Sequence, residues 1–185
     1  MGRTLPFWFL ALLMLTALPA RGAEMRTVEL GVFGGFFFAD SGAGVDDDLV
    51  YGVRAGYNFT PVHEMEFIYD RVDTAFASPS FGWLDETFQT YTLEWTFNFP
   101  VPRGPLVPYG FIGLSAVQDK VTRPDGGRSS DDDVFVPFGG GLRVFAGDNM
   151  AVRFEARFKP FRTFEVHQNN FELSVGLSWA LGRRR

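Results

Sequence analysis

Residues 49–59 read LVYGVRAGYNF, in which two kinds of side chain alternate. Every second residue is apolar or aromatic: Leu49, Tyr51, Val53, Ala55, Tyr57 and Phe59. The opposite set is small or polar: Gly52, Arg54, Gly56 and Asn58. Successive side chains of a β-strand point to opposite faces, so this period of two predicts a strand with one apolar and one polar face.

The same alternation marks eight segments, each long enough to cross a bilayer as a tilted strand. The predicted strands are Val28–Ala39, Leu49–Phe59, His63–Val72, Thr87–Phe99, Val107–Lys120, Val134–Phe145, Met150–Phe161 and Asn170–Leu181. Short turns alternate with longer loops, which we place at Asp40–Asp48, Asp73–Glu86, Val121–Asp133 and Arg162–Asn169. This pattern predicts an all-β fold, an eight-stranded antiparallel up-and-down transmembrane β-barrel.

A soluble lipocalin-like barrel would show the same alternation with its apolar face inward. The interior of an eight-stranded barrel is only just wide enough for side chains to fill, and the apolar faces carry too many aromatic rings to fit there. The polar faces instead carry small residues: Gly31, Gly35, Gly52, Gly56, Gly113, Gly139, Gly141 and Gly176. We therefore expect the apolar face to contact lipid.

The N-terminus has the three parts of a secretory signal peptide. Arg3 precedes an apolar run from Leu5 to Leu18, and Ala20 and Ala23 provide small residues for cleavage. We therefore expect a signal peptide over residues 1–23, cut after 20 or 23, and a barrel over residues 24–185; an uncleaved anchor is the alternative. The chain has no cysteine, and its formal net charge of −5 argues against a nucleic-acid partner.

Short turns on the periplasmic side and longer loops outside are the usual asymmetry of outer-membrane barrels. We therefore expect both termini in the periplasm, extracellular loops, and a location in the outer membrane of a Gram-negative cell. An aromatic girdle is expected near the short turns, from Tyr57, Phe59, Phe97, Phe99 and Trp179.

The chain resembles the small eight-stranded outer-membrane barrels of the OmpA transmembrane-domain type, over essentially everything after the signal. The most specific element is the last strand, where Ser174, Gly176, Trp179 and Leu181 look like the family's C-terminal assembly signal. The resemblance implies recognition by the barrel-assembly machinery and contact with outer-membrane lipid and lipopolysaccharide. The residues after Leu181, Gly182 to Arg185, depart from the family pattern, and we expect no cell-wall-binding domain and leave the oligomeric state open.

Charged residues on the predicted inward face are the best candidate site. They are Glu29, Arg54, Glu66, Asp70, Glu94, Arg143, Arg153, Glu155, Arg157, Lys159 and Glu172. Unpaired buried charges are very costly, so these groups must pair. They are interpreted as a salt-bridged plug or, alternatively, as a gate in which an Arg exchanges carboxylate partners.

Two acidic triplets, Asp46-Asp47-Asp48 and Asp131-Asp132-Asp133, are candidates for Ca²⁺ or Mg²⁺, or for cation bridges to lipopolysaccharide phosphates. They lack EF-hand spacing, and solvated loop charge is the simpler interpretation. His167, with Glu172 to orient it, invites comparison with lipid A deacylases. Position 169 is Asn, however, so the expected hydroxyl nucleophile is missing. The glycine-rich segments lie inside strands and are not phosphate loops, so we expect no cofactor.

These observations favour a non-enzymatic structural or surface barrel with a salt-bridged lumen and at most a narrow gated passage. The alternatives are adhesion or ligand binding through the acidic extracellular loops, a small-solute pore, and a lipid A-modifying enzyme.

Overall fold

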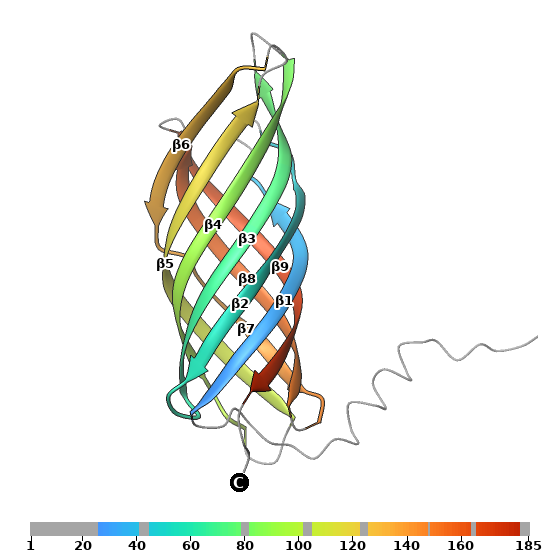
Figure 1. Ribbon diagram of the computed structural model, residues 1–185, viewed down its shortest axis with the longest axis vertical. Helices are drawn as coiled ribbons and strands as arrows, with labels where there is room; N and C mark the ends of the chain where they lie inside the picture. The colour runs from blue at the N-terminus through green and yellow to red at the C-terminus, as the bar shows by residue number, and fades with distance from the viewer. Residues whose placement is uncertain are drawn as a thin grey trace, which may run out of the picture.

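Antiparallel β-strands make up most of the computed structural model, which describes residues 26–40, 45–78, 82–101, 105–122, 126–147, 149–163 and 166–181 (Figure 1). The strands are β1 (Thr27–Phe38), β2 (Asp48–Asn58), β3 (His63–Ser78), β4 (Gly82–Asn98), β5 (Leu106–Thr122), β6 (Arg128–Phe135), β7 (Phe138–Phe145), β8 (Met150–Thr163) and β9 (Val166–Leu181). None of the described residues forms a helix long and apolar enough to cross a membrane. The predicted signal peptide and the residues after Leu181 lie outside the described part.

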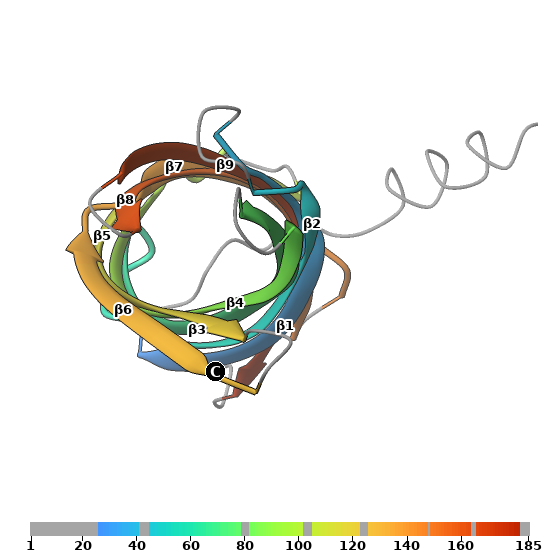
Figure 2. The ribbon, with the colours of Figure 1, turned by 90° about the horizontal axis from the view of Figure 1, so that it is seen from above.

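Pairing of the first strand with the last closes the sheet into a barrel. β1 pairs with β9 from Val28↔Leu181 to Phe38↔Phe171, and every other pairing is also antiparallel. β6 and β7 both pair with β5 and follow one another along it, so the nine strands occupy eight positions around the ring (Figure 2). The predicted eight-stranded antiparallel barrel is thereby confirmed.

The interruption between β6 and β7 leaves part of the wall without strand pairing, because β6 is not hydrogen-bonded as a ladder to β8. Gly113 donates its amide to the Pro137 carbonyl at 2.9 Å, which holds the break against β5. β7 forms a ladder with β8, whereas β6 pairs with β5 alone among the described strands. The Arg162 amide donates across the gap to Asp133 Oδ2 at 2.6 Å. We call this gap between β6 and the end of β8 the seam.

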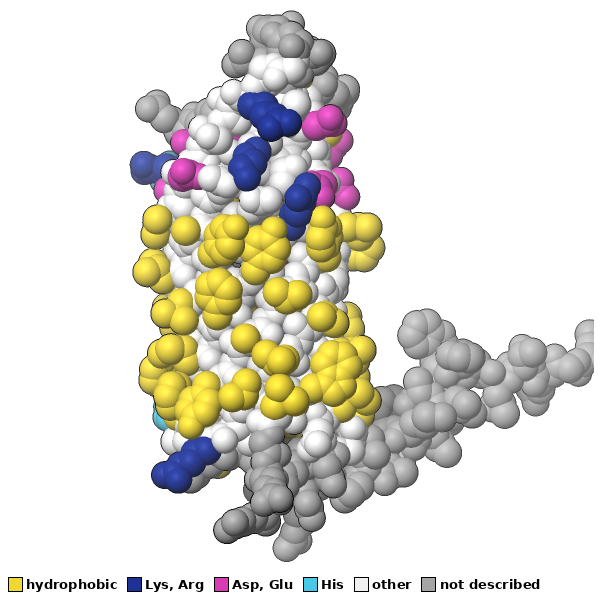
Figure 3. Space-filling view, in the orientation of Figure 1, with side chains coloured by type: hydrophobic (Ala, Val, Ile, Leu, Met, Phe, Trp, Pro, Cys, Tyr) yellow, Lys and Arg dark blue, Asp and Glu magenta, His cyan; other side chains and the backbone are white. Residues whose placement is uncertain are grey.

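The outside of the barrel carries a belt of apolar side chains, shown in yellow in Figure 3. On the wall made by β3 to β6, the last apolar row is Tyr69, Tyr91, Ala116 and Val134, which lie opposite one another in register. We call the end of the barrel beyond this row the upper end and the end with both described termini the lower end (Figure 1). Above the row the wall is polar and charged.

Aromatic side chains ring the lower border of the belt, as the sequence predicts. Tyr57, Phe59, Phe97, Phe99 and Trp179 are all exposed there. Trp95 belongs to the same ring, because its indole stacks on Phe59 and donates to His63 Nδ1 at 3.3 Å.

Glycines on the inward face make room for aromatic rings in the lumen. A Cβ on Gly141 would lie 2.6 Å from the Tyr109 ring, and a Cβ on Gly52 would lie 2.5 Å from the Phe33 ring. A Cβ on Gly139 would similarly meet the Phe111 ring at 2.6 Å. These glycines therefore act by being small, which agrees with their predicted inward position.

Three predicted loops are wrong in extent, because strands continue into them. β3 and β4 pair as far as Ser78↔Gly82, where Gly82 adopts a positive φ of 76°, so most of the expected loop 73–86 is strand. β6 begins at Arg128 inside the expected loop 121–133, and β9 begins at Val166 inside the expected loop 162–169. Above the belt the outward face of these strands is polar, so the outward apolar pattern ends before the hydrogen-bonded ladder does.

Candidate functional site: the barrel lumen

An ionic network fills the lower part of the lumen. Four arginines reach inward from β2, β7 and β8 and meet five glutamates from β1, β3, β4 and β8. Its members are Arg54, Arg143, Arg153, Arg157, Glu29, Glu64, Glu66, Glu94 and Glu155. The alternation of β8 points Arg153, Glu155 and Arg157 the same way, so one strand supplies a third of the network.

Several short contacts in the ionic network cross the barrel. Arg153 Nη1 lies 2.6 Å from Glu66 Oε1, and Arg143 Nη2 lies 2.8 Å from Glu64 Oε2. Charged hydrogen bonds of this length are strong, and each joins strands that are not neighbours in the sheet. The network therefore braces the barrel from inside.

Several members of the network contact two carboxylates at once. Arg157 lies 2.6 Å from both Glu94 and Glu155. Arg54 lies 2.9 Å from Glu155 and 3.4 Å from Glu66. Each arginine thus has a second partner already in place, which is the arrangement that exchange between partners requires.

Aromatic rings line the network. Tyr109 donates its hydroxyl to Glu155 Oε2 at 2.8 Å, and the Arg153 guanidinium lies 4.9 Å from the Tyr109 ring centre. Arg157 lies 4.4 Å from the Phe111 ring centre, and Arg54 lies 4.6 Å from that of Phe33. These cation–π contacts add attraction for the arginines without adding negative charge.

A separate lysine triad lies nearer the upper end. Lys159 Nζ is 2.9 Å from Asp70 Oδ1 and 2.7 Å from Glu172 Oε2. The three side chains come from β8, β3 and β9 and are almost fully buried. Together with the ionic network, seven carboxylates meet five cations, so the lumen is acidic in balance.

An apolar cluster occupies the upper lumen. Its members are Phe33, Phe37, Val45, Val50, Ile68, Val72, Phe88, Val117, Phe135 and Phe161. On each strand that supplies both groups, the cluster members lie nearer the upper end than the ionic-network members do. Phe88 and Phe161 pack with ring centres 5.5 Å apart, and Phe161 packs on Phe135 at 5.3 Å. Solvent reaches almost none of the ionic network, with Arg143 0 % and Arg153 1 % exposed.

Two further carboxyl groups face inward above the last apolar row, outside the membrane-spanning part of their strands. Burial, with the negative charge of neighbouring Asp119, raises the pKa of Glu86 to about 8. Burial likewise raises the pKa of Asp119 to about 7, and Asp131 adds to the increase. These two groups are therefore the titrating pair at the upper mouth.

The structure places every residue of the predicted lumen charge set inside the barrel and in ion-pair contact. Glu64 is missing from that prediction, although it lies two residues before Glu66 on the same face of β3. The apolar cluster is also missing from it. Its signal was the set of apolar residues at inward positions, such as Val50 beside Gly52 and Arg54.

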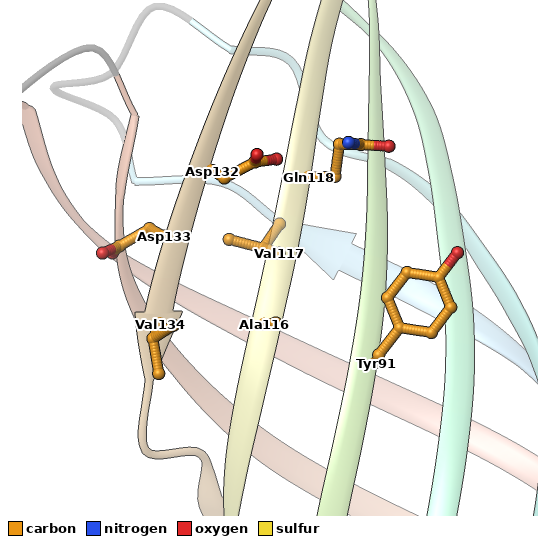
Figure 4. A pocket seen from close by; sticks show the side chains of 7 residues that line it. All are labelled: Tyr91, Ala116, Val117, Gln118, Asp132, Asp133 and Val134. Atoms are coloured by element: carbon orange, nitrogen blue, oxygen red, sulfur yellow. The ribbon is translucent and has the colours of Figure 1, made fainter.

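The acidic triplets do not converge on a common point. The triplet Asp131–Asp133 lies on β6. Its Asp132 points outward at the rim of a depression of about 650 Å³ over Ala116, whereas Asp133 points toward the seam (Figure 4). In the other triplet, Asp47 accepts from the Ala39 amide and Asp48 from the Leu49 amide. Within the described part of the chain, no three His, Cys, Asp or Glu side chains come together as a metal site.

The pairing of His167 with Glu172 that a deacylase would need is not formed. His167 is exposed and contacts Arg162 at 2.7 Å, whereas Glu172 points into the lumen toward Lys159. In the last strand, Ser174 and Gly176 face inward and Trp179 and Leu181 face outward, so the assembly-signal residues divide between the two faces.

A family model described as outer membrane protein beta-barrel domain matches residues 7–178, and the chain belongs to this family. Its members are barrels of the Gram-negative outer membrane, which is where this barrel therefore lies. No curated protein matches the sequence.

Solved structures of the same fold are distant in sequence. Neisserial surface protein A is 17 % identical, with a TM-score of 0.71 over 82 % of this chain and 96 % of that chain. The N-terminal barrel domain of Pseudomonas aeruginosa OprF is 17 % identical, with a TM-score of 0.64 over 86 % and 100 %. Ail, the attachment invasion locus protein of Yersinia pestis, is 13 % identical, with a TM-score of 0.56 over 85 % and 99 %.

Proposed function

We propose that this protein is a non-enzymatic structural barrel whose lumen is closed at rest. The supporting observation is that side chains fill the lumen along its length. The ionic network occupies the lower part, and the apolar cluster with the buried lysine triad occupies the upper part. Ions would have to cross both, and the apolar cluster offers them no hydration. The salt-bridged plug is therefore favoured over an open pore.

We further propose that the upper end faces the cell exterior and that both termini lie in the periplasm. The supporting feature is the asymmetry of the barrel about its apolar belt. At the upper end β3, β4 and β5 continue well beyond the last apolar row, whereas at the lower end β2 stops one residue before Phe59 of the aromatic ring. Ser174, Gly176, Trp179 and Leu181 would then present the assembly signal to the barrel-assembly machinery from the periplasmic side.

A gated passage requires both the ionic network and the apolar cluster to rearrange. Arg157 would have to exchange Glu94 for Glu155, with which it is already in contact, and the rings around Phe88 would have to part. Exchange within the ionic network alone therefore leaves the upper lumen sealed.

Conductance in planar bilayers tests this proposal. The wild type and Arg157→Ala are expected to stay at the baseline current, while the combination of Arg157→Ala with Phe88→Ala and Phe161→Ala admits ions. Steady conductance of the wild type, or opening by Arg157→Ala alone, would show that the network is a gate rather than a plug. Migration on a cold SDS gel verifies that each variant is folded.

Binding at the cell surface is a second candidate function, and it is favoured by the strands that continue above the belt. β3, β4 and β5 extend beyond the last apolar row and present a charged wall (Figures 1 and 3). Ail, a protein of the same fold, is an attachment invasion locus protein. Deleting residues 41–44 and 123–125 tests adhesion: loss of cell-surface binding by a correctly folded barrel supports it, and unchanged binding opposes it.

A further inference from the structure

A depression of about 550 Å³ lies on the outer wall of the barrel between β3, β4, β5 and β6. The side chains that matter here are Arg71, Thr87, Gln89, Lys120, Arg128 and Ser130. Three are cations, Ser130 and Gln89 bring a hydroxyl and an amide that can donate hydrogen bonds, and the Thr87 hydroxyl donates to Asp73 beside the depression. None of the described residues lining the depression is a carboxylate. This is the chemistry of an anion site.

The cations of the depression are only partly neutralised. Lys120 Nζ donates to the Gln89 carbonyl oxygen at 3.0 Å and forms no ion pair with the described residues, and neither does Arg128. Arg71 is paired with Asp73, with Nη2 and Oδ1 2.6 Å apart, and that pair is exposed. Lys120 and Arg128 therefore supply the attraction, while Asp73 holds Arg71 in place.

The depression starts where the apolar belt ends. Tyr69 and Tyr91 belong to the last apolar row, and two residues further along the same strands come Arg71 and Gln89, which lie opposite each other. Lys120 and Thr87 face each other one row higher. In Figure 3 basic side chains stand directly above the yellow belt on this wall. This height corresponds to lipid headgroups rather than to hydrocarbon or open solvent.

We propose that the depression binds a phosphate group of a lipid headgroup in the leaflet at the upper end of the barrel, a phosphorylated saccharide lipid such as lipopolysaccharide. Clustered Lys and Arg at headgroup depth attract anionic lipid. The hydroxyl of Ser130 and the amide nitrogen of Gln89 suit phosphate and sugar oxygens, whereas the Thr87 hydroxyl donates to Asp73 Oδ1 at 2.9 Å. The acidic triplets, which would need bridging cations, are not required for this contact.

The test measures binding of lipid A to the folded, detergent-solubilised protein by native mass spectrometry and thermophoresis. Lys120→Gln with Arg128→Gln should weaken binding of phosphorylated lipid A about tenfold or more. The control combines Arg26→Gln with Arg162→Gln, which makes the same change in net charge away from the depression and should leave binding unchanged. Wild-type protein should prefer phosphorylated over dephosphorylated lipid A by a similar factor.

Four outcomes would overturn the proposal. They are equal losses in the depression and control variants, no loss in either, equal binding of dephosphorylated lipid A, and displacement of lipid A by equimolar inorganic phosphate. Tighter binding of a sulfated oligosaccharide than of lipid A would instead assign the depression to a soluble polyanion. Cold migration on an SDS gel shows that every variant is folded.

Discussion

Arg157 Nη1 of β8 lies 2.6 Å from Glu94 Oε2 of β4, and the two strands are not neighbours in the sheet. The same guanidinium bonds Glu155, and both side chains of the Arg157–Glu94 pair are almost completely buried. One residue thus ties two walls of the barrel together across the lumen. Its removal leaves Glu94 without an ion-pair partner among the described residues, whereas Glu155 keeps its contact with Arg54.

Arg157→Ala is therefore expected to destabilise the barrel by about 3–5 kcal/mol, because breaking a buried ion pair leaves uncompensated charge behind. Arg71→Ala removes an exposed pair with Asp73 and should cost about 0–1 kcal/mol. Urea unfolding in lipid vesicles measures both. Similar losses for the two variants would contradict the bracing role of the ionic network.

Gly141→Ala should destabilise the barrel by about 1–3 kcal/mol, because its Cβ would press on the Tyr109 ring and on the Phe154 carbonyl. Gly110→Ala is the matched control, since the nearest atom to its Cβ would be 3.7 Å away, an ordinary contact. Unfolding midpoints of the two variants should separate clearly. A tolerated Gly141→Ala would mean that Tyr109 has room to move within the lumen.

Phe88→Ala should destabilise the barrel by about 3–5 kcal/mol, because Phe88 packs on both Phe37 and Phe161 at the centre of the apolar cluster. Phe88→Leu keeps most of the volume and should lose less than half as much. The pair of urea midpoints distinguishes packing from a specific need for a ring. Equal losses would indicate that the ring contacts, rather than the filled volume, stabilise the upper lumen.

Stability should fall as the pH rises from about 5 to about 9. The pKa of Glu86 is raised to about 8 and that of Asp119 to about 7, so the folded barrel holds protons that the unfolded chain releases at lower pH. The stabilisation is complete at acidic pH and is lost as the pH passes these values.

Glu86→Gln should remove much of this pH dependence, because the carboxyl group with the higher pKa of the two no longer titrates. Asp85→Asn changes a neighbouring exposed acid and should leave the slope intact. Unfolding midpoints across the pH range provide the comparison. A slope that survives Glu86→Gln in full would assign the titration to other groups.

Much of the barrel could be predicted from period-two alternation, because lipid and a narrow lumen impose opposite demands on adjacent residues. The extensions of β3 and β4 could not, since Asp73 and Thr87 lie in water and carry no apolar signal although they are still paired. The inward position of charged residues could be predicted where they alternate with apolar residues, as along β8. The inward position of Val50 and Phe88 could not be predicted, because an apolar residue on the inward face cannot be told from a break in the alternation of apolar and polar residues.

The seam between β6 and β8 gives the two halves of the barrel different mechanics. Below Pro137 the wall is a closed tube, in which each strand is hydrogen-bonded on both sides. Above it, the wall is joined at the seam by the bond from Arg162 to Asp133. A tube slit along its length resists torsion far less than an intact one. We therefore expect larger twisting and opening motions in the upper half of the barrel than in the lower half.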